Sequence, residues 1–153
     1  MAASAPCTVP DDMAERVSLP FALDIPFVQA LGMQLWRFDN GLAEISLEVR
    51  PEMQNSWAVA HGGVVMTLLD VVMAHAARSV RDTDDHGTPG IVTVEMKTSF
   101  LRPTTGRLMA TGKLLHATKS MAFCEGSVHD DKGALCAHAT GTFKFLRALK
   151  RNP

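Results

Sequence analysis

Hydrophobic and polar positions alternate over several short stretches of the chain, and each stretch predicts a β-strand. Apolar and polar side chains alternate through residues 42–49, as expected of a strand with one face in a core. The Asn40-Gly41 pair before it is a hairpin turn signal, which pairs this strand with residues 31–38. Similar patterns between turn signals predict further strands over 92–100, 108–115, 121–129 and 135–146.

One long helix is predicted among these strands, over residues 62–79. This stretch lacks proline, and its apolar residues recur at helical spacing. Asp70 is the one formally charged residue between positions 53 and 77, so the helix is expected to be buried and not laid on a surface. A shorter helix is predicted around residues 27–30.

The order of these elements predicts an α+β fold. A helix and a hairpin come first, then the long buried helix, then three or four antiparallel strands wrapped against it. The last three strands are joined by short connections and are expected to form an antiparallel meander. Connections this short exclude a doubly wound parallel sheet.

Composition and charge describe an ordinary globular domain. The chain has 153 residues, of which 46% are hydrophobic and 20% charged, values that suit one domain with its own core. We expect a flexible leader over residues 1–20, the domain over 21–147 and a polar tail over 148–153. The 15 Lys and Arg nearly balance the 16 Asp and Glu, so nucleic acid and anionic membranes are not expected as partners.

The cysteines and the N-terminal sequence indicate a cytoplasmic protein. The 3 cysteines follow no disulfide or zinc spacing, which favours a reducing compartment. The first residues have neither the basic nor the apolar region of a secretory signal. No stretch of about 20 apolar residues offers a membrane span.

The start of the predicted long helix is a candidate binding site. Gly62 and Gly63 permit a tight turn and close approach by another molecule. The first N–H groups of a helix lack internal partners and carry partial positive charge, so they suit an anion or a carbonyl oxygen that gains charge. The alternative is a simple loop-to-helix turn in which both glycines serve packing.

Asp70 is the second candidate, because a carboxylate among apolar helical neighbours costs several kcal/mol unless it is paired. Small residues surround it on the helical wheel, which leaves room for a ligand or a close backbone. A catalytic role and a structural role at a subunit interface carry equal weight. His61 lies on the opposite side of the helix, so the two residues share a site only if two subunits supply them; His61 can instead cap the helix.

Other catalytic and metal-binding motifs are absent from the sequence. No nucleophile elbow, P-loop or dinucleotide-binding glycine motif occurs. The remaining histidines have no metal-ligand spacing, so no metal site is expected. These histidines are His75, His86, His116, His129 and His138.

The spaced set of Asn55, His61-Gly62-Gly63 and Asp70 resembles hotdog-fold acyl-CoA thioesterases of the phenylacetate-degradation (PaaI-like) type. The resemblance extends over about residues 25–147 and includes family-like segments at 92–96, 100–103 and 106–108. It implies a curved antiparallel sheet wrapped around one long helix. It also implies a homodimer, usually assembled into a dimer of dimers, with active sites at the subunit interface.

The resemblance also implies roles for individual residues. Asp70 would be the nucleophile or the general base, and the Gly62 N–H would be the oxyanion donor. Asn55 would orient the water or the carbonyl, His61 would position the thioester, and Thr93 would hold the water near the carboxylate.

The resemblance makes coenzyme A part of the substrate, and no separate cofactor is expected. Family members hold CoA along the segments that correspond here to Arg102-Pro103 and to a hairpin bend containing Lys119 and Ser120. The usual glycine of that bend is replaced by Thr118, while Lys119 keeps a charge that suits phosphate.

Three functions follow from these observations. The first is hydrolysis of an aryl-, short- or medium-chain acyl-CoA to a free acid and CoA. The second is an acyl-CoA-binding hotdog protein without catalysis, against which the intact Asp70 argues. A hotdog hydratase or dehydratase ranks third, since no hydratase-type motif lies near the start of the helix.

Overall fold

A computed structural model describes residues 16–81 and 90–146 of the chain. The predicted tail over 148–153 lies outside the described residues, as does most of the predicted leader. The described part holds six strands, one long helix and two short helical segments. In chain order they are α1 (Pro26–Leu31), β1 (Gln34–Asp39), β2 (Leu42–Glu48), the 3-10 segment η2 (Pro51–Met53), α2 (Gly62–Arg78), β3 (Gly90–Phe100), β4 (Arg107–Ala117), β5 (Met121–His129) and β6 (Leu135–Leu146).

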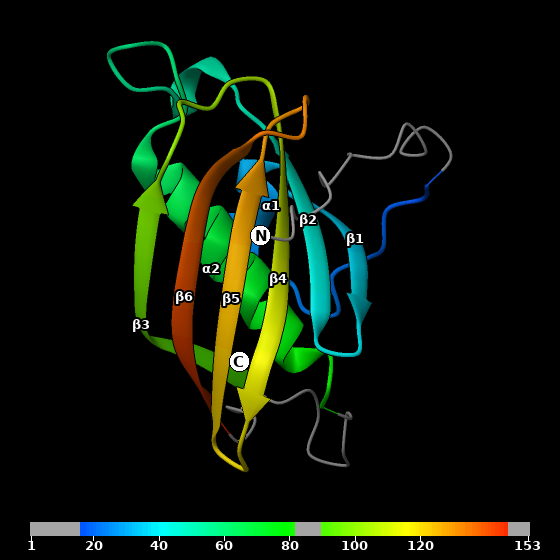
Figure 1. Cartoon of the computed structure of the whole chain (residues 1–153). Coiled ribbons are helices and arrows are strands. Elements are labelled where there is room, and N and C mark those ends of the chain that lie inside the picture. Colours follow the sequence, from blue (N-terminus) through cyan, green and yellow to red (C-terminus); the bar gives the residue numbers. More distant parts are fainter. Residues whose placement is uncertain (1–15, 82–89, 147–153) are drawn as a thin grey trace.

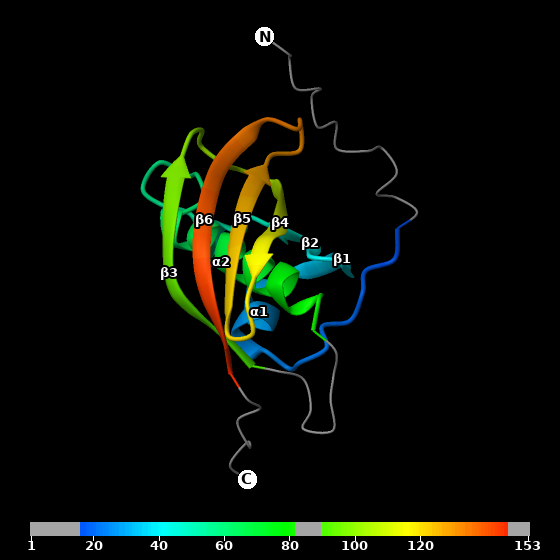
Figure 2. The ribbon, with the colours of Figure 1, turned by 60° about the horizontal axis from the view of Figure 1, so that its bottom comes forward.

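The six strands form one curved antiparallel sheet that wraps around α2 (Figures 1 and 2). Its strand order is β1-β2-β4-β5-β6-β3. The predicted meander is confirmed as β4, β5 and β6, and the predicted α+β architecture is confirmed with it. β3 pairs with β6 and ends the sheet, so the chain crosses the end of the sheet between β3 and β4.

The crossing between β3 and β4 is held by backbone hydrogen bonds. The N–H groups of Leu101 and Arg102 donate to the carbonyl oxygen of Cys136, at 2.8 and 3.1 Å. Thr104 accepts from the N–H of Ala60 at 2.8 Å. These bonds lay the connection against the segment that leads into α2, so they place it beside the start of the helix.

α2 presents its apolar side to the concave face of the sheet. Val65, Leu68, Leu69, Val72 and Met73 are buried there. The helix approaches β4 closely, since a side chain at Gly112 would collide with the backbone of Val72. Burying this apolar surface supplies most of the driving force for the fold.

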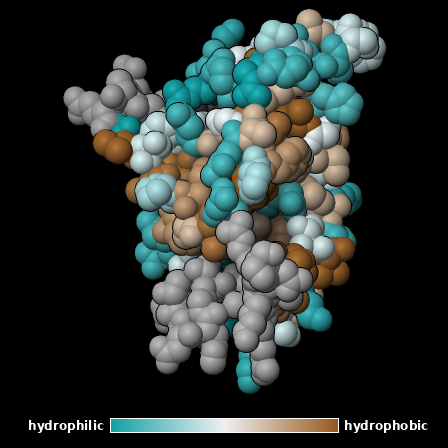
Figure 3. All heavy atoms as spheres, turned by 180° about the vertical axis from the view of Figure 1, so that it is seen from behind, coloured by the Kyte–Doolittle hydropathy of each residue, from teal (hydrophilic) through white to brown (hydrophobic). Residues whose placement is uncertain are grey.

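The opposite side of α2 stays partly open in one chain. Met66 is exposed, and Thr67, Asp70 and Ala74 are only half-buried. Hydrophobic side chains reach the surface in the middle of this face, among hydrophilic ones (Figure 3). The expected burial of the helix is therefore confirmed for the side that packs on the sheet. The opposite side of α2 is left open to a ligand or to another chain.

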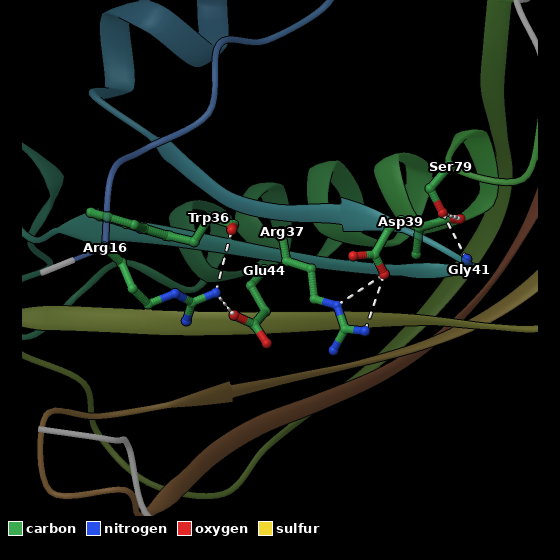
Figure 4. Close-up of polar contacts among 8 residues, drawn as sticks. Arg16, Trp36, Arg37, Asp39, Gly41, Glu44 and Ser79 are labelled. Atoms are coloured by element: carbon green, nitrogen blue, oxygen red, sulfur yellow. Dashed lines mark hydrogen bonds and ion pairs between the residues drawn. The ribbon is translucent and has the colours of Figure 1, made fainter. Parts of the chain in front are cut away.

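The hairpin of β1 and β2 turns at Asn40 and Gly41 as predicted. Both residues have positive φ, 47° and 79°, as a two-residue turn that follows the twist of the strands requires. The Gly41 N–H donates to Ser79 Oγ at 2.8 Å, which ties the turn to the end of α2 (Figure 4). Predicted strand 31–38 begins later than expected, at Gln34, because α1 extends to Leu31 and ends on a left-handed Gly32.

Across the described ranges, no helix is long and apolar enough to span a membrane.

Candidate active site

The loop before α2 is a compact turn organised by Asn55. Its backbone N–H donates to the Val59 carbonyl at 2.8 Å, and its carbonyl accepts from Ala58 at 3.0 Å. The side-chain Oδ1 accepts from the N–H of Trp57 at 2.9 Å. This bond leaves the side-chain NH2 group of Asn55 for a substrate or a water.

His61 caps the first turn of α2, and Gly62 is left with a free N–H. The Nδ1 atom of His61 accepts from the N–H of Gly63 at 3.0 Å, while its carbonyl accepts from Val64 at 2.9 Å. The N–H of Gly62 has no acceptor among the described residues. A free donor at the positive end of a helix suits an oxygen that gains negative charge. His61 therefore caps the helix with Nδ1, as the capping alternative predicts, and its other ring nitrogen, Nε2, remains available for a ligand.

A cavity of about 480 Å³ lies beside this helix start. It brings together four residues predicted from the sequence: Asn55, Gly62, Arg102 and Pro103. The other lining residues are largely apolar: Trp57, Val59, Ala60, Val65, Phe100, Leu101, Thr104 and Cys136. A mostly apolar lining with a few polar groups is typical of a small-molecule site.

Asp70 meets Thr93 on the open side of α2. The Thr93 hydroxyl, on the edge strand β3, donates to Asp70 Oδ1 at 2.5 Å. Thr67 does not compete for the carboxylate, because its hydroxyl donates to the Gly63 carbonyl at 2.8 Å. The bond to Thr93 orients the carboxylate and leaves Oδ2 for another partner.

One chain keeps the Asp70–Thr93 pair apart from the helix start. Asp70 lies eight residues beyond Gly62, which is about 12 Å along a helix. Neither Asp70 nor Thr93 lines the cavity beside Gly62. A reacting carbonyl must lie about 3 Å from both a base and an oxyanion donor, so the two halves cannot act on one substrate within a single chain.

The residues predicted to contact CoA also fall into two groups. Arg102 Nη1 donates to the Leu135 carbonyl at 2.5 Å, which fixes its guanidinium beside the cavity. Lys119 and Ser120 lie in the β4–β5 bend, at the other end of the sheet (Figure 1). Arg81 holds that bend near the end of α2 by donating to the Thr118 carbonyl at 2.6 Å.

Sequence reasoning missed a second cavity, of about 400 Å³, between α1 and the first turns of α2. His61, Gly63 and Thr67 line it from α2 and its cap, and Phe27 and Arg50 line it from the other side. The helical pattern around 27–30 was the available signal, but no local pattern tells which side of α2 a short helix covers. His61 therefore lines this second cavity and not the cavity beside Gly62.

Comparisons with known proteins bear on the family and on the fold. The family model of the thioesterase superfamily matches residues 58–137, a stretch that includes Gly62, Asp70 and Thr93. The medium/long-chain acyl-CoA thioesterase YigI of Escherichia coli K12 is 30% identical over 135 residues, which cover 80% of this chain and 87% of YigI.

Solved structures share the fold. The conserved protein PA5202 from Pseudomonas aeruginosa is 28% identical, with a TM-score of 0.72 over 80% of this chain and 95% of that protein. The PaaI protein of the Escherichia coli phenylacetic acid degradation operon is 23% identical, with a TM-score of 0.73 over 80% of this chain and 86% of PaaI.

Proposed function

Because the chain belongs to the thioesterase superfamily and has the hotdog fold, we propose that it hydrolyses an acyl-CoA thioester to a carboxylic acid and free CoA. The family resemblance drawn from Asn55, His61-Gly62-Gly63 and Asp70 is confirmed by this membership. The observation that carries the proposal is the Asp70 carboxylate, oriented by Thr93 on the open side of the helix whose first N–H is free.

Asp70 is the residue that starts the reaction. Its free carboxylate oxygen either takes a proton from a water that attacks the thioester carbonyl, or attacks that carbonyl itself. Thr93 keeps Oδ1 occupied, so that Oδ2 faces the water or the carbonyl. In both routes the C–S bond breaks, and the CoA thiolate leaves and takes up a proton. Direct attack by Asp70 leaves a mixed anhydride between its carboxylate and the acyl group, and water then hydrolyses this anhydride to release the acid and restore Asp70.

The helix start stabilises the charge that develops on the thioester oxygen. The Gly62 N–H donates to this oxygen, since it has no other acceptor among the described residues. Asn55 orients the carbonyl or the water with its free NH2 group, and His61 positions the thioester with Nε2. A Cβ at position 62 would lie in ordinary van der Waals contact with the ring of Phe100, at 3.4 Å, so glycine keeps the space beside this N–H open.

The active site is complete in a homodimer joined along β3. This strand pairs with β6 on one side only, and Val92 and Val94 are 43% and 55% exposed on it. An unpaired edge with exposed β-branched residues is suited to pair with a second copy. Two-fold symmetry makes the pairing antiparallel, so the Gly62 end of one helix lies toward Asp70 of the other.

The same antiparallel arrangement unites the residues expected to hold CoA. Arg102 and Pro103 lie at the start of α2, and Lys119 and Ser120 lie near its end. Reversing one copy against the other brings the first pair of one chain toward the second pair of its partner. Lys119 and Arg102 then supply positive charge for the CoA phosphates, and two such dimers form the assembly expected from the family.

We propose a medium-chain acyl group. Medium chains lie within the range expected from the sequence, and the similar protein YigI is a medium/long-chain acyl-CoA thioesterase. The apolar walls of the cavity near Gly62, which include Phe100 and Leu101, suit an acyl chain or the pantetheine arm.

Release of free thiol from a series of acyl-CoAs tests this function. We expect hydrolysis to peak among medium chains in a series from acetyl- to palmitoyl-CoA that includes phenylacetyl-CoA. Asp70→Asn should lower kcat by at least about 100-fold, while Asp131→Asn, in an exposed turn, should leave it unchanged. Thiol background from the protein's own cysteines is subtracted.

Two results would contradict the proposal. Near wild-type turnover by Asp70→Asn would remove Asp70 from the mechanism. Tight acyl-CoA binding with no thiol release across the series would favour the binding protein without catalysis.

A further inference from the structure

A third cavity, of about 210 Å³, lies at the other end of α2 from the helix start. Its walls come from the segment before α1, from β1 and from the last turn of α2. The lining residues are Leu19, Pro20, Ala22, Leu35, Phe38, His75 and Arg78. Arg78 is sixteen residues from Gly62, about 24 Å along the helix, so this cavity is distinct from the candidate active site.

Arg78 is a buried cation with unmet hydrogen-bonding capacity. The residue is only 5% exposed, and its Nε and Nη2 atoms have no acceptor. It forms no ion pair with any acidic residue in the part of the chain that the structure describes. Burial lowers the pKa of the guanidinium, but an arginine stays protonated in proteins. A buried unpaired charge is costly, so this end of the cavity is suited to an anion.

His75 adds a second unmatched polar atom to the same wall. It is 4% exposed, and its Nδ1 lies 2.8 Å from the carbonyl oxygen of Val71. A carbonyl only accepts, so Nδ1 carries the hydrogen in the neutral ring and Nε2 is an acceptor. Nε2 has no donor. The rings of Phe21 and Phe38 contact the imidazole edge-on, at 5.3 and 6.0 Å between centroids, and hold it in place.

The apolar wall of this cavity is fastened to the sheet. The Leu19 N–H donates to the Leu35 carbonyl at 2.7 Å. Arg16 pairs with Glu44 at 3.0 Å and donates to the Trp36 carbonyl at 3.3 Å (Figure 4). The segment that carries Leu19 and Ala22 is therefore held over β1, and the cavity beneath it is a built feature of the fold.

We propose that this cavity binds a small monocarboxylic acid. The two oxygens of the carboxylate accept from Nε and Nη2 of Arg78, which have no other acceptor among the described residues, and the carboxylate compensates the charge of the guanidinium. The apolar body of the acid packs against Leu19, Leu35 and Phe38. Inorganic phosphate is a poorer match because a single guanidinium and an apolar wall face it. A neutral alcohol or amide leaves the charge of Arg78 without compensation.

Calorimetric titration of the full-length protein with benzoate and with hexanoate tests this site. We expect one acid to bind per chain at this site, with benzamide, benzyl alcohol and inorganic phosphate at least about tenfold weaker. Arg78→Met should weaken benzoate binding by at least about tenfold, while Arg78→Lys should keep part of the affinity. Arg81→Met is the matched control, since Arg81 lies in the same region and bonds to Thr118 instead.

Arg78→Met is expected to fold, because methionine removes an unpaired buried charge and with it the cost of burying that charge. If Arg78→Met does not fold, the proposal is tested by the partial benzoate affinity expected of Arg78→Lys and by the preference of the wild-type protein for benzoate over the other ligands. The proposal is overturned if benzoate binds Arg78→Met as well as wild type, or binds wild type no better than benzamide does. It is also overturned if Asp70→Asn, and not Arg78→Met, removes binding, because benzoate then occupies the thioester site. Because this cavity is distinct from the candidate active site, benzoate binding at Arg78 does not depend on whether the protein hydrolyses thioesters.

Discussion

The hydrogen bond between Thr93 and Asp70 decides how the carboxylate can act. An aspartate on a helix has several rotamers, and a free carboxylate would present either oxygen to a substrate. The Thr93 hydroxyl selects one arrangement by donating to Oδ1 at 2.5 Å. Hydrogen bonds to charged groups contribute about 1.5–3 kcal/mol, which is enough to keep the carboxylate in this orientation.

Replacing Thr93 by valine should therefore slow catalysis without unfolding the protein. Valine has nearly the same shape and the same strand preference, but it lacks the hydroxyl. We expect kcat for a medium-chain acyl-CoA to fall by about 10- to 100-fold, the equivalent of one hydrogen bond to a charge. Thr93→Ser, which restores the donor, should recover most of this loss. Wild-type kcat in Thr93→Val would show that the bond does not orient the carboxylate.

At the scale of single elements, the unpaired edge of β3 is where we propose that two chains pair. Val94 is the more exposed of the two valines of β3. Val94→Lys places a charge in the proposed strand pairing, which is how natural edge strands avoid association. Light scattering should then show a smaller assembly than wild type, and thioester hydrolysis should be lost with it.

Val80→Lys is the control for this change, since Val80 is exposed just beyond α2 and away from β3. It should keep both the assembly and the activity. A Val94→Lys variant that keeps the wild-type mass would contradict pairing along β3.

The elements themselves could be predicted because each is specified by local chemistry. Alternation specifies the strands, helical spacing specifies α2, and Asn40-Gly41 specifies the hairpin. The place of β3 could not be predicted in this way. Every paired position of β3 meets a residue of β6 that lies at least 37 residues away in sequence. Nothing in the local pattern of β3 distinguishes β6 from β4 as a partner.

The candidate site was predictable to a similar extent. The spacing of Asn55, Gly62 and Asp70 is local, so the sequence could single out these residues as candidates for a site that two subunits would share. The cavity that joins Asn55 to Arg102 depends on the crossing between β3 and β4, and the contact between Thr93 and Asp70 depends on tertiary packing. The cavity at Arg78 could not be recognised from the sequence, because a single arginine in a helix is ordinarily exposed.

At the scale of the whole molecule, burial of His75 makes stability depend on pH. Burial lowers the pKa of His75 from 6.5 to about 4, so the unfolded chain binds a proton there more readily than the folded chain. The contribution of His75 to the free energy of unfolding is therefore fully present above pH 6.5, and it is lost as the pH falls toward 4. The shift corresponds to about 3 kcal/mol.

His75→Phe should remove this contribution. Urea unfolding at pH 7 and pH 4.5 should show a smaller loss of stability in His75→Phe than in wild type, because phenylalanine does not titrate. His116→Gln, at an exposed histidine, should behave like wild type. An equal loss in His75→Phe and wild type would show that His75 is not buried in its neutral form.

The proposed dimer would allow the two halves of the proposed active site to be disabled separately. Gly62→Pro removes the N–H donor while keeping a favourable residue at the first position of the helix. His61 already has an extended backbone, with φ of -61° and ψ of 138°, as the residue before a proline requires. Asp70→Asn removes the carboxylate. Each variant alone should lose at least about 100-fold in kcat.

Mixing these two variants tests the shared active site most directly. In a mixed dimer one site combines the intact Gly62 of one chain with the intact Asp70 of its partner, and the other site carries both defects. Equimolar co-expression should therefore restore about a quarter of wild-type thioester hydrolysis, since half of the dimers are mixed and each has one intact site. Activity no higher than the average of the two separate variants would contradict a site shared between two chains.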